Sequence, residues 1–196
     1  SDDIGGLISV LESIQVDSIW DTHMDYHSWT YKRILELAEE NNTGIRKLIS
    51  GEINRIDGNT AVEVFAPDTV FIKHESNVNN ASIVMKLIHG ENSFLFTGDL
   101  EHEGDAFLLS FGSVLKTDVL KVGHHGSITS TTQAFLNLAK PTWAVVSVGN
   151  KNKFNHPSPI VMERLSEKVS NIRRTDLHQA AWFKSDGEKI WEVDWR

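Results

Sequence analysis

The chain has 196 residues, of which 40% are hydrophobic, and this is long enough for one hydrophobic core. Its formal net charge of -8 excludes a broadly basic surface that captures nucleic acid, so any phosphate binding is local. Since the chain has no cysteine, disulfides, thiolate metal ligands and a cysteine nucleophile are also excluded. These properties predict a single domain over residues 1–196.

The chain shows no sign of membrane insertion or secretion. No apolar run approaches the roughly 18 residues that span a bilayer, and no signal peptide opens the sequence. We therefore expect a soluble protein, and a cytoplasmic location is favoured. The first residues form a loop-to-helix junction rather than a natural start, which predicts that further residues precede Ser1.

The first half of the chain alternates between helical and extended patterns. The apolar set Leu7, Val10, Leu11 and Ile14 has helical spacing. The pattern then predicts a strand over 16–20, a helix over 27–42, extended stretches around 47–56, 61–65 and 83–88, and a hairpin partner over 94–96.

The second half predicts strand and helix in turn. We expect helices over 104–111, 132–138 and 159–169, strands over 119–122 and 143–148, and a final β region over 172–174, 181–184 and 190–193 with a turn at 185–187. This order indicates a mixed α/β protein whose functional residues lie at strand ends.

Carboxylate and imidazole side chains follow three of these strands. Asp99 comes after strand 94–96, His124 and His125 after strand 119–122, and His156 after strand 143–148. Both groups supply lone pairs to zinc, manganese or iron at neutral pH. Together they are typical of a two-metal hydrolytic site, in which one carboxylate bridges the ions.

Several motifs resemble one known family. They are FLFTGDLE at 94–101, DVLKVGHHGSITS at 118–130, PTWAVVSVGNKNKFNHPSP at 141–159 and RRTDLHQAAWFKSDGE at 173–188. They resemble the metallo-β-lactamase superfamily, in particular the C-terminal domain of ComEC-type competence proteins and their soluble relatives. The segment VNNASIV at 78–84 resembles the family segment that carries Asn and Ser in place of a histidine ligand.

The resemblance implies an α/β (α+β) fold, the αββα four-layer sandwich of the superfamily. Residues 2–7, DDIGGL, resemble the tail of the family's H-x-H-x-D-H-x-G-G loop. The first strands and most of that loop would then be missing before residue 1, so the sandwich would be incomplete at its N-terminus.

The resemblance also implies a ligand set for two divalent ions, with zinc, manganese or iron as candidates. Asp99 would bridge the ions, and Asp2 would bind the second ion. Asp3 stands where the family has its last histidine, and an oxygen donor there favours manganese, magnesium or iron. One of His124 and His125 would bind metal and the other would line the pocket. The spacing does not decide between them, and His124 is the favoured ligand.

Further roles follow from the same resemblance. His125, His156 and Asp99 would be catalytic, and Ser127, Ser130, Asn152 and Lys153 would bind substrate. Thr175 and Asp176 would orient a histidine from behind. The alternative for these last two residues is a strand with an exposed salt bridge.

The function implied by the resemblance is metal-dependent hydrolysis, as a phosphodiesterase or nuclease that acts on DNA. One alternative is a hydrolase of a small ester, thioester, lactone or nucleotide. A second is a non-catalytic binding or assembly module with a decayed metal site, which Asp3 and the missing ligand segment favour. In that case an unpaired strand edge would favour a homodimer or another partner chain.

Overall fold

The computed structural model describes residues 4–22, 24, 27–74 and 77–194. Its contacts divide the chain into two compact units, residues 1–48 and residues 49–196. The single domain expected over residues 1–196 stays a prediction. Among the described residues, no helix is both long and apolar enough to cross a membrane.

The first unit packs two helices beside a small parallel sheet. Its elements are α1 (Gly5–Ser13), β1 (Ser18–Asp21), α2 (Trp29–Glu40) and β2 (Gly44–Lys47). Ser28 caps α2, because its hydroxyl accepts a hydrogen bond from the Tyr31 amide at 3.1 Å. Leu11, Ile34 and Leu37 are buried between the helices and form a separate small core.

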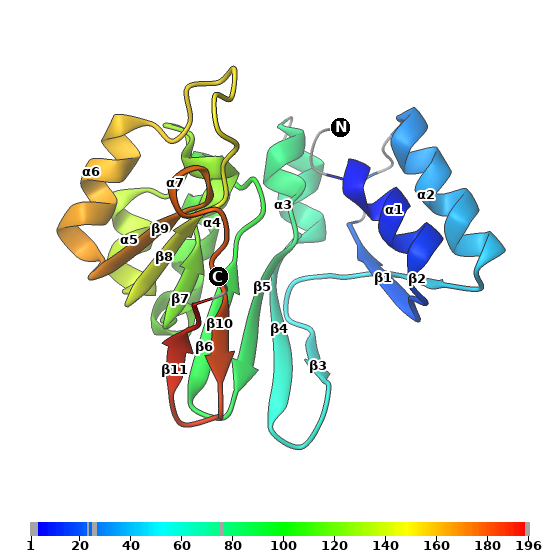
Figure 1. The fold of residues 1–196 in the computed structure, drawn as a ribbon, viewed down its shortest axis with the longest axis horizontal. Coiled ribbons are helices and arrows are strands. Elements are labelled where there is room, and N and C mark those ends of the chain that lie inside the picture. Colours follow the sequence, from blue (N-terminus) through cyan, green and yellow to red (C-terminus); the bar gives the residue numbers. More distant parts are fainter. Residues whose placement is uncertain (1–3, 23, 25–26, 75–76, 195–196) are drawn as a thin grey trace. The chain divides into compact units, whose positions relative to one another are not determined.

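The second unit contains a seven-stranded sheet in the order β3-β4-β5-β6-β7-β8-β9 (Figure 1). Pairing is antiparallel from β3 to β6 and parallel from β6 to β9. The strands are β3 (Ile53–Arg55), β4 (Thr60–Ala66), β5 (Val84–His89), β6 (Asn92–Phe96), β7 (Val119–Lys121), β8 (Trp143–Val146) and β9 (Asn171–Arg174). The carboxyl ends of the four parallel strands therefore meet at one edge of the sheet.

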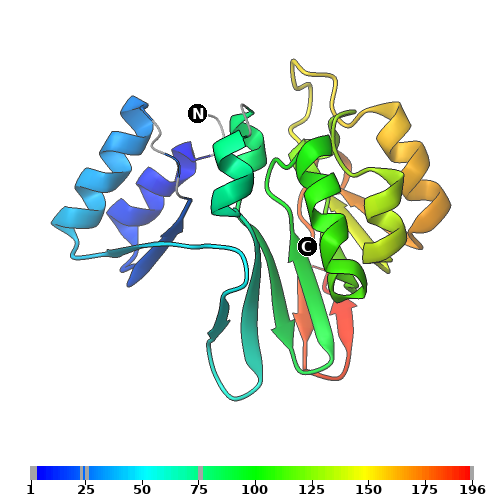
Figure 2. The same ribbon diagram turned by 180° about the vertical axis from the view of Figure 1, so that it is seen from behind.

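Helices connect the parallel strands and cover one face of the sheet (Figure 2). The α-helices of this unit are α3 (Thr69–His74), α4 (His102–Leu108), α5 (Gln133–Ala139), α6 (Pro159–Lys168) and α7 (Thr175–His178). Short 3-10 helices span Val78–Ala81, Leu109–Leu115 and Gly123–Gly126.

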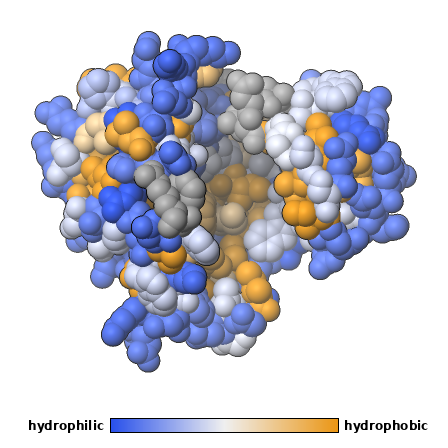
Figure 3. All heavy atoms as spheres, in the orientation of Figure 1, coloured by the Kyte–Doolittle hydropathy of each residue, from blue (hydrophilic) through white to orange (hydrophobic). Residues whose placement is uncertain are grey.

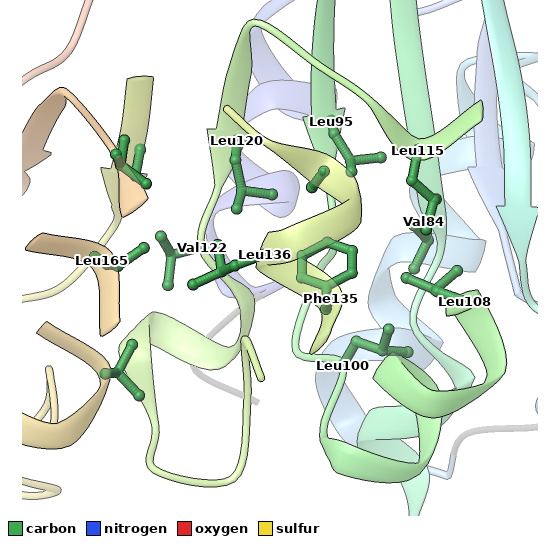
Figure 4. Packing of buried hydrophobic residues seen from close by; sticks show 14 of the residues in the cluster. Val84, Leu95, Leu100, Leu108, Leu115, Leu120, Val122, Phe135, Leu136 and Leu165 are labelled. Atoms are coloured by element: carbon green, nitrogen blue, oxygen red, sulfur yellow. The ribbon is translucent and has the colours of Figure 1, made fainter. Parts of the chain in front are cut away.

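The main core lies between the sheet and α4, α5 and α6 (Figure 4). Leu95 and Leu120 point from the strands into this core, and Phe135 and Leu165 meet them from the helices, with all four side chains fully buried. Strand residues alternate between the two faces of a sheet. The neighbours of Leu95 and Leu120 therefore lie on the opposite face.

A hairpin partly covers that opposite face. It consists of β10 (Phe183–Ser185) and β11 (Ile190–Glu192), and Phe183 packs edge-on against Phe94 and Trp143. Beside the hairpin is an apolar pocket of about 440 Å³, lined by residues that include Leu87 and Phe96. Figure 3 shows hydrophobic residues gathered over the middle of this face.

The mixed α/β class predicted from the sequence is confirmed, and the architecture is consistent with the metallo-β-lactamase fold. One expectation needs correction: the extended stretch around 47–56 is interrupted. Strand β2 ends at Lys47 and β3 begins at Ile53, because a turn intervenes. In that turn Gly51 has a φ of 91°, and its amide donates to the Val64 carbonyl. The helix expected over 104–111 is α4, followed by 3-10 turns.

Candidate active site

The candidate site lies at the carboxyl edge of the parallel strands. Asp99 follows β6, His124 and His125 follow β7, and His156 lies on the loop after β8. We call these four residues the Asp–His cluster. The ring centroids of His124 and His156 are 5.7 Å apart, and those of His124 and His125 are 6.2 Å apart. The strand-end placement inferred from the sequence thus brings all four together.

The two adjacent histidines have unusual backbone conformations. His124 and His125 have φ values of 42° and 54°, in the left-handed region that residues with a Cβ rarely occupy. They belong to the histidine loop, residues 123–132, which is closed by internal hydrogen bonds. The Ser130 hydroxyl donates to the Gly123 carbonyl at 2.7 Å, and the Gly123 amide donates to Thr131 Oγ1 at 3.1 Å. These bonds hold the rings in place against the backbone cost.

The hydrogen bonds of His125 assign its tautomer. Its Nδ1 lies 2.7 Å from the Ser147 carbonyl oxygen. Because a carbonyl only accepts, Nδ1 must carry the proton. In the neutral ring, Nε2 then has a lone pair, and this atom lies 3.5 Å from Asp99 Oδ1. His125 therefore offers either a metal donor or a proton acceptor beside the carboxylate.

A lysine balances the charge of Asp99. Lys121 Nζ donates to the Gly98 carbonyl at 2.8 Å and lies 3.9 Å from Asp99 Oδ1. The Asp99 amide also donates to the Ser82 hydroxyl at 3.0 Å. Ser82 thus holds the backbone of Asp99, and Lys121 faces its carboxylate.

Glu101 is a part of the site that the sequence reasoning missed. Its Oε1 lies 3.0 Å from His124 Nδ1, a buried atom whose contact with the carboxylate is not aligned as a hydrogen bond. The same Oε1 accepts from Asn79 Nδ2 at 2.7 Å, and the Glu101 amide donates to Asn80 Oδ1 at 2.9 Å. The signal was a second carboxylate two positions after Asp99.

His156 has a lowered pKa. Burial is the largest cause, and the neighbouring His124 and His125 lower the pKa further, while Asp99 acts in the opposite direction. Burial disfavours the imidazolium of His156, and so do the charges of His124 and His125 whenever those rings are protonated. His156 is therefore held toward its neutral form, in which one ring nitrogen donates and the other accepts.

The predicted substrate residues lie on two loops beside the cluster. The buried Ser130 hydroxyl also donates to the Ser127 carbonyl, and Ser127 Oγ lies 2.9 Å from Thr129 Oγ1, so both hydroxyls help to shape the histidine loop. Asn152 shapes the loop that carries Lys153 and His156. Direct contact of these four residues with a substrate stays a prediction.

Thr175 and Asp176 lie at the end of β9. The Thr175 hydroxyl donates to the Val148 carbonyl at 2.8 Å and accepts from the Val148 amide at 2.7 Å. Asp176 pairs with Arg174 at 2.6 Å, and this guanidinium lowers the pKa of the Asp176 carboxyl. This contact is the salt bridge that was the alternative interpretation of Asp176. The role of both residues in orienting a histidine stays a prediction.

The described residues fit only part of a metal site. Asp99 and His125 face each other with an oxygen and a nitrogen donor, a pair that suits zinc, manganese or iron. Within the described ranges, however, no group of three His, Cys, Asp or Glu side chains is placed to hold an ion. The predicted ligands Asp2 and Asp3 lie outside the described residues. Binding of an ion by His124, the ligand favoured from the sequence, stays a prediction, as does binding by Asp2 and Asp3.

Comparison with known proteins identifies the family. The family model described as the metallo-beta-lactamase superfamily matches residues 3–149, well over half of the chain. The chain belongs to the metallo-β-lactamase superfamily. The motifs at the ends of β6 and β7 lie inside the matched range, so the family resemblance seen in the sequence is confirmed. Members of this superfamily generally bind divalent metals, and the membership supports a hydrolase-like chain.

Curated relatives of this superfamily member include competence proteins. The chain is 32% identical over 153 residues to ComE operon protein 3 of Bacillus subtilis, which covers 78% of the chain and 19% of that protein. It is 39% identical over 106 residues to Competence protein ComA of Neisseria gonorrhoeae, and this match covers 54% of the chain and 15% of that protein. It is 37% identical over 114 residues to Recombination protein 2 of Haemophilus influenzae, and this match covers 58% of the chain and 14% of that protein. The chain spans less than a fifth of each of these relatives.

Proposed function

We propose that this chain is a metal-dependent hydrolase that cleaves phosphodiester bonds in DNA. The observation that carries the proposal is the convergence of Asp99, His124, His125 and His156 at the carboxyl edge of the parallel strands. Relatives named for competence and recombination support DNA as the substrate. Asp99 would hold a metal ion together with His124 or His125 and with donors outside the described residues.

A divalent ion supplies Lewis-acid activation of water and of phosphoryl oxygens. The residues of the chain supply the rest. His125, protonated at Nδ1, presents its Nε2 lone pair next to Asp99. Neutral His156 donates one N–H to a phosphate oxygen, and Lys121 offsets the negative charge that gathers around Asp99. The histidine loop keeps these groups in fixed positions.

The first test joins metal analysis with cleavage assays on the full 196-residue chain. We expect bound divalent metal by elemental analysis and manganese-stimulated cleavage of a single-stranded oligonucleotide. Turnover of bis-p-nitrophenyl phosphate without any DNA cleavage would replace the nuclease with a small-molecule hydrolase. The absence of both bound metal and turnover of either substrate would contradict a hydrolase function altogether.

A non-catalytic binding module is the second candidate, and one observation favours it. Within the described ranges, no group of three His, Cys, Asp or Glu side chains is placed to hold an ion. Such a module would bind DNA or a partner chain with unchanged affinity after addition of EDTA or manganese. The proposed hydrolase instead gains cleavage activity from manganese, so the two candidates separate in one assay.

Replacement of Glu101 by glutamine tests the contact with His124. We expect Glu101→Gln to lower kcat for bis-p-nitrophenyl phosphate by roughly 10- to 100-fold, as for other residues that support a ligand from behind. Glutamine retains the oxygen that accepts from Asn79 but removes the charge 3.0 Å from His124 Nδ1.

The matched control for this variant is Glu103→Gln. Glu103 accepts a hydrogen bond from Asn80 Nδ2 at 3.1 Å and lies two positions further along the chain. We expect wild-type kcat from this control and similar melting temperatures for both variants. Equal kcat values for the Glu101 and Glu103 variants would contradict the support of His124 by Glu101.

A further inference from the structure

The Asp–His cluster continues outward into an exposed phenylalanine. Phe154 stacks on His156 with ring centroids 5.7 Å apart and planes inclined by 20°, and His156 in turn lies 5.7 Å from His124. The Phe154 side chain is 59% exposed, although it is large and apolar. A row of rings therefore leads from solvent to the histidine beside Glu101 and on to His125 and Asp99.

The loop that presents Phe154 is fixed by one side chain, that of Asn152. Asn152 Nδ2 donates to the carbonyls of Gly149 at 3.1 Å and His156 at 2.7 Å. Asn152 Oδ1 accepts from the amides of Phe154 at 3.2 Å and His156 at 3.0 Å. These bonds place the backbone of Phe154 and His156 in one rigid turn, so the ring is held out to solvent by structure.

Positive charge accompanies the exposed ring. Lys153 Nζ lies 5.0 Å from the centroid of the Phe154 ring. Because the whole chain carries a formal charge of -8, a polyanion has to be attracted by local cations of this kind. An aromatic ring next to a lysine is the combination by which proteins bind single-stranded nucleic acid without reading its sequence.

We propose that Phe154 is a base-stacking residue of this site: an unpaired nucleobase packs on its ring while the adjoining phosphate lies over His156 and His124. This inference rests on the proposed function and narrows its substrate to single-stranded DNA. In a duplex, the faces of the bases are covered by their neighbours, so a base would have to leave the stack to reach Phe154. Lys153 neutralises a phosphate on the outer side of the ring.

The test measures binding of three fluorescent oligonucleotides to the full chain by anisotropy, in EDTA so that no strand is cut. The probes are oligo(dT), an abasic strand of the same length and charge, and a duplex. Phe154→Ala is compared with Phe154→Trp and with Trp191→Ala. Trp191 is also exposed, but it lies on the β10–β11 hairpin. The turn of this hairpin at Gly187 accepts a hydrogen bond from the Glu91 amide, just before β6 begins, whereas Asp99 follows the end of β6.

We expect Phe154→Ala to weaken oligo(dT) binding by roughly 5- to 100-fold, the range that corresponds to one stacked base. Binding of the abasic strand and of the duplex should not change, Phe154→Trp should retain wild-type affinity, and Trp191→Ala should match wild type. Unchanged oligo(dT) binding in Phe154→Ala, or equal losses on the abasic strand, would overturn the stacking role.

The outcomes also separate this inference from the proposed function. A wild-type chain that cleaves oligo(dT) with manganese, and whose Phe154→Ala variant binds the oligonucleotide equally well, leaves the nuclease standing and removes only the stacking residue. A wild-type chain that neither binds nor cleaves any of the three probes overturns both.

Discussion

Asp99→Asn is expected to lower kcat for phosphodiester hydrolysis by about a thousand-fold or more, with little change in melting temperature. Asp99 is the residue on which the other groups converge: His125 Nε2 lies 3.5 Å from its carboxylate and Lys121 Nζ lies 3.9 Å away. Asparagine has nearly the same size but loses the charge and one of the two acceptor oxygens. Both a metal donor and the partner of His125 are thereby removed.

The fold should tolerate this change because the ion pair with Lys121 is partly exposed and contributes about 1 kcal/mol or less. Asp186→Asn is the matched control, since Asp186 accepts from the Glu188 and Lys189 amides in the exposed hairpin turn. We expect wild-type kcat from the control. Hydrolysis by Asp99→Asn within about ten-fold of the control would exclude Asp99 from the catalytic site.

Asp105→Asn is expected to change how stability depends on pH. Asp105 is 2% exposed, and its carboxylate accepts from the Thr132 amide at 2.6 Å. Burial is the main cause that raises its pKa from 3.8 to about 6, while hydrogen bonds from Thr132 and the charge of Arg164 oppose the rise.

The direction of the effect follows from the two protonation states. Between about pH 4 and pH 6 the folded protein keeps a proton that the unfolded chain has already lost, so rising pH destabilises the fold through this group. At neutral pH the cost is about 3 kcal/mol. Asparagine keeps an acceptor for Thr132 but cannot ionise. The free energy of unfolding of Asp105→Asn, relative to wild type, should therefore rise by about 2 kcal/mol from pH 4 to pH 7.

Urea unfolding followed by circular dichroism at several pH values measures this difference. Asp176→Asn is the comparison of opposite sign, because Arg174 lowers the pKa of Asp176 and its contribution to stability is lost as the pH falls. Parallel pH profiles for Asp105→Asn and wild type would show that ionisation of Asp105 in the folded state costs nothing.

The frame of the site is predictable from the sequence because its signals are local. Apolar runs define β6, β7 and β8, and a polar residue directly after such a run must lie at the carboxyl edge. This rule is sufficient to place Asp99, His124 and His125 at one edge of the sheet. His156 follows from its position on the next loop.

The rest of the site depends on contacts between distant parts of the chain. Glu101 reaches His124 and Asn79, which lie on separate segments, and no spacing rule connects them. Asp105 occupies an ordinary position in α4, and its burial depends on packing against Thr132, a residue 27 positions away in the sequence. The exposure of Phe154 likewise depends on the turn that Asn152 builds from its own side-chain hydrogen bonds.

The left-handed backbone of His124 and His125 also limits how this site can be redesigned. Apart from glycine, asparagine and aspartate are the residues that share histidine's tolerance of positive φ, whereas β-branched residues are strongly disfavoured there. Exchange of either imidazole for an Asp carboxylate or an Asn amide therefore keeps this backbone conformation accessible, whereas valine, isoleucine or threonine would strain it. Metal preference at these two positions can therefore be changed most readily by Asp or Asn, which offer oxygen donors on short side chains.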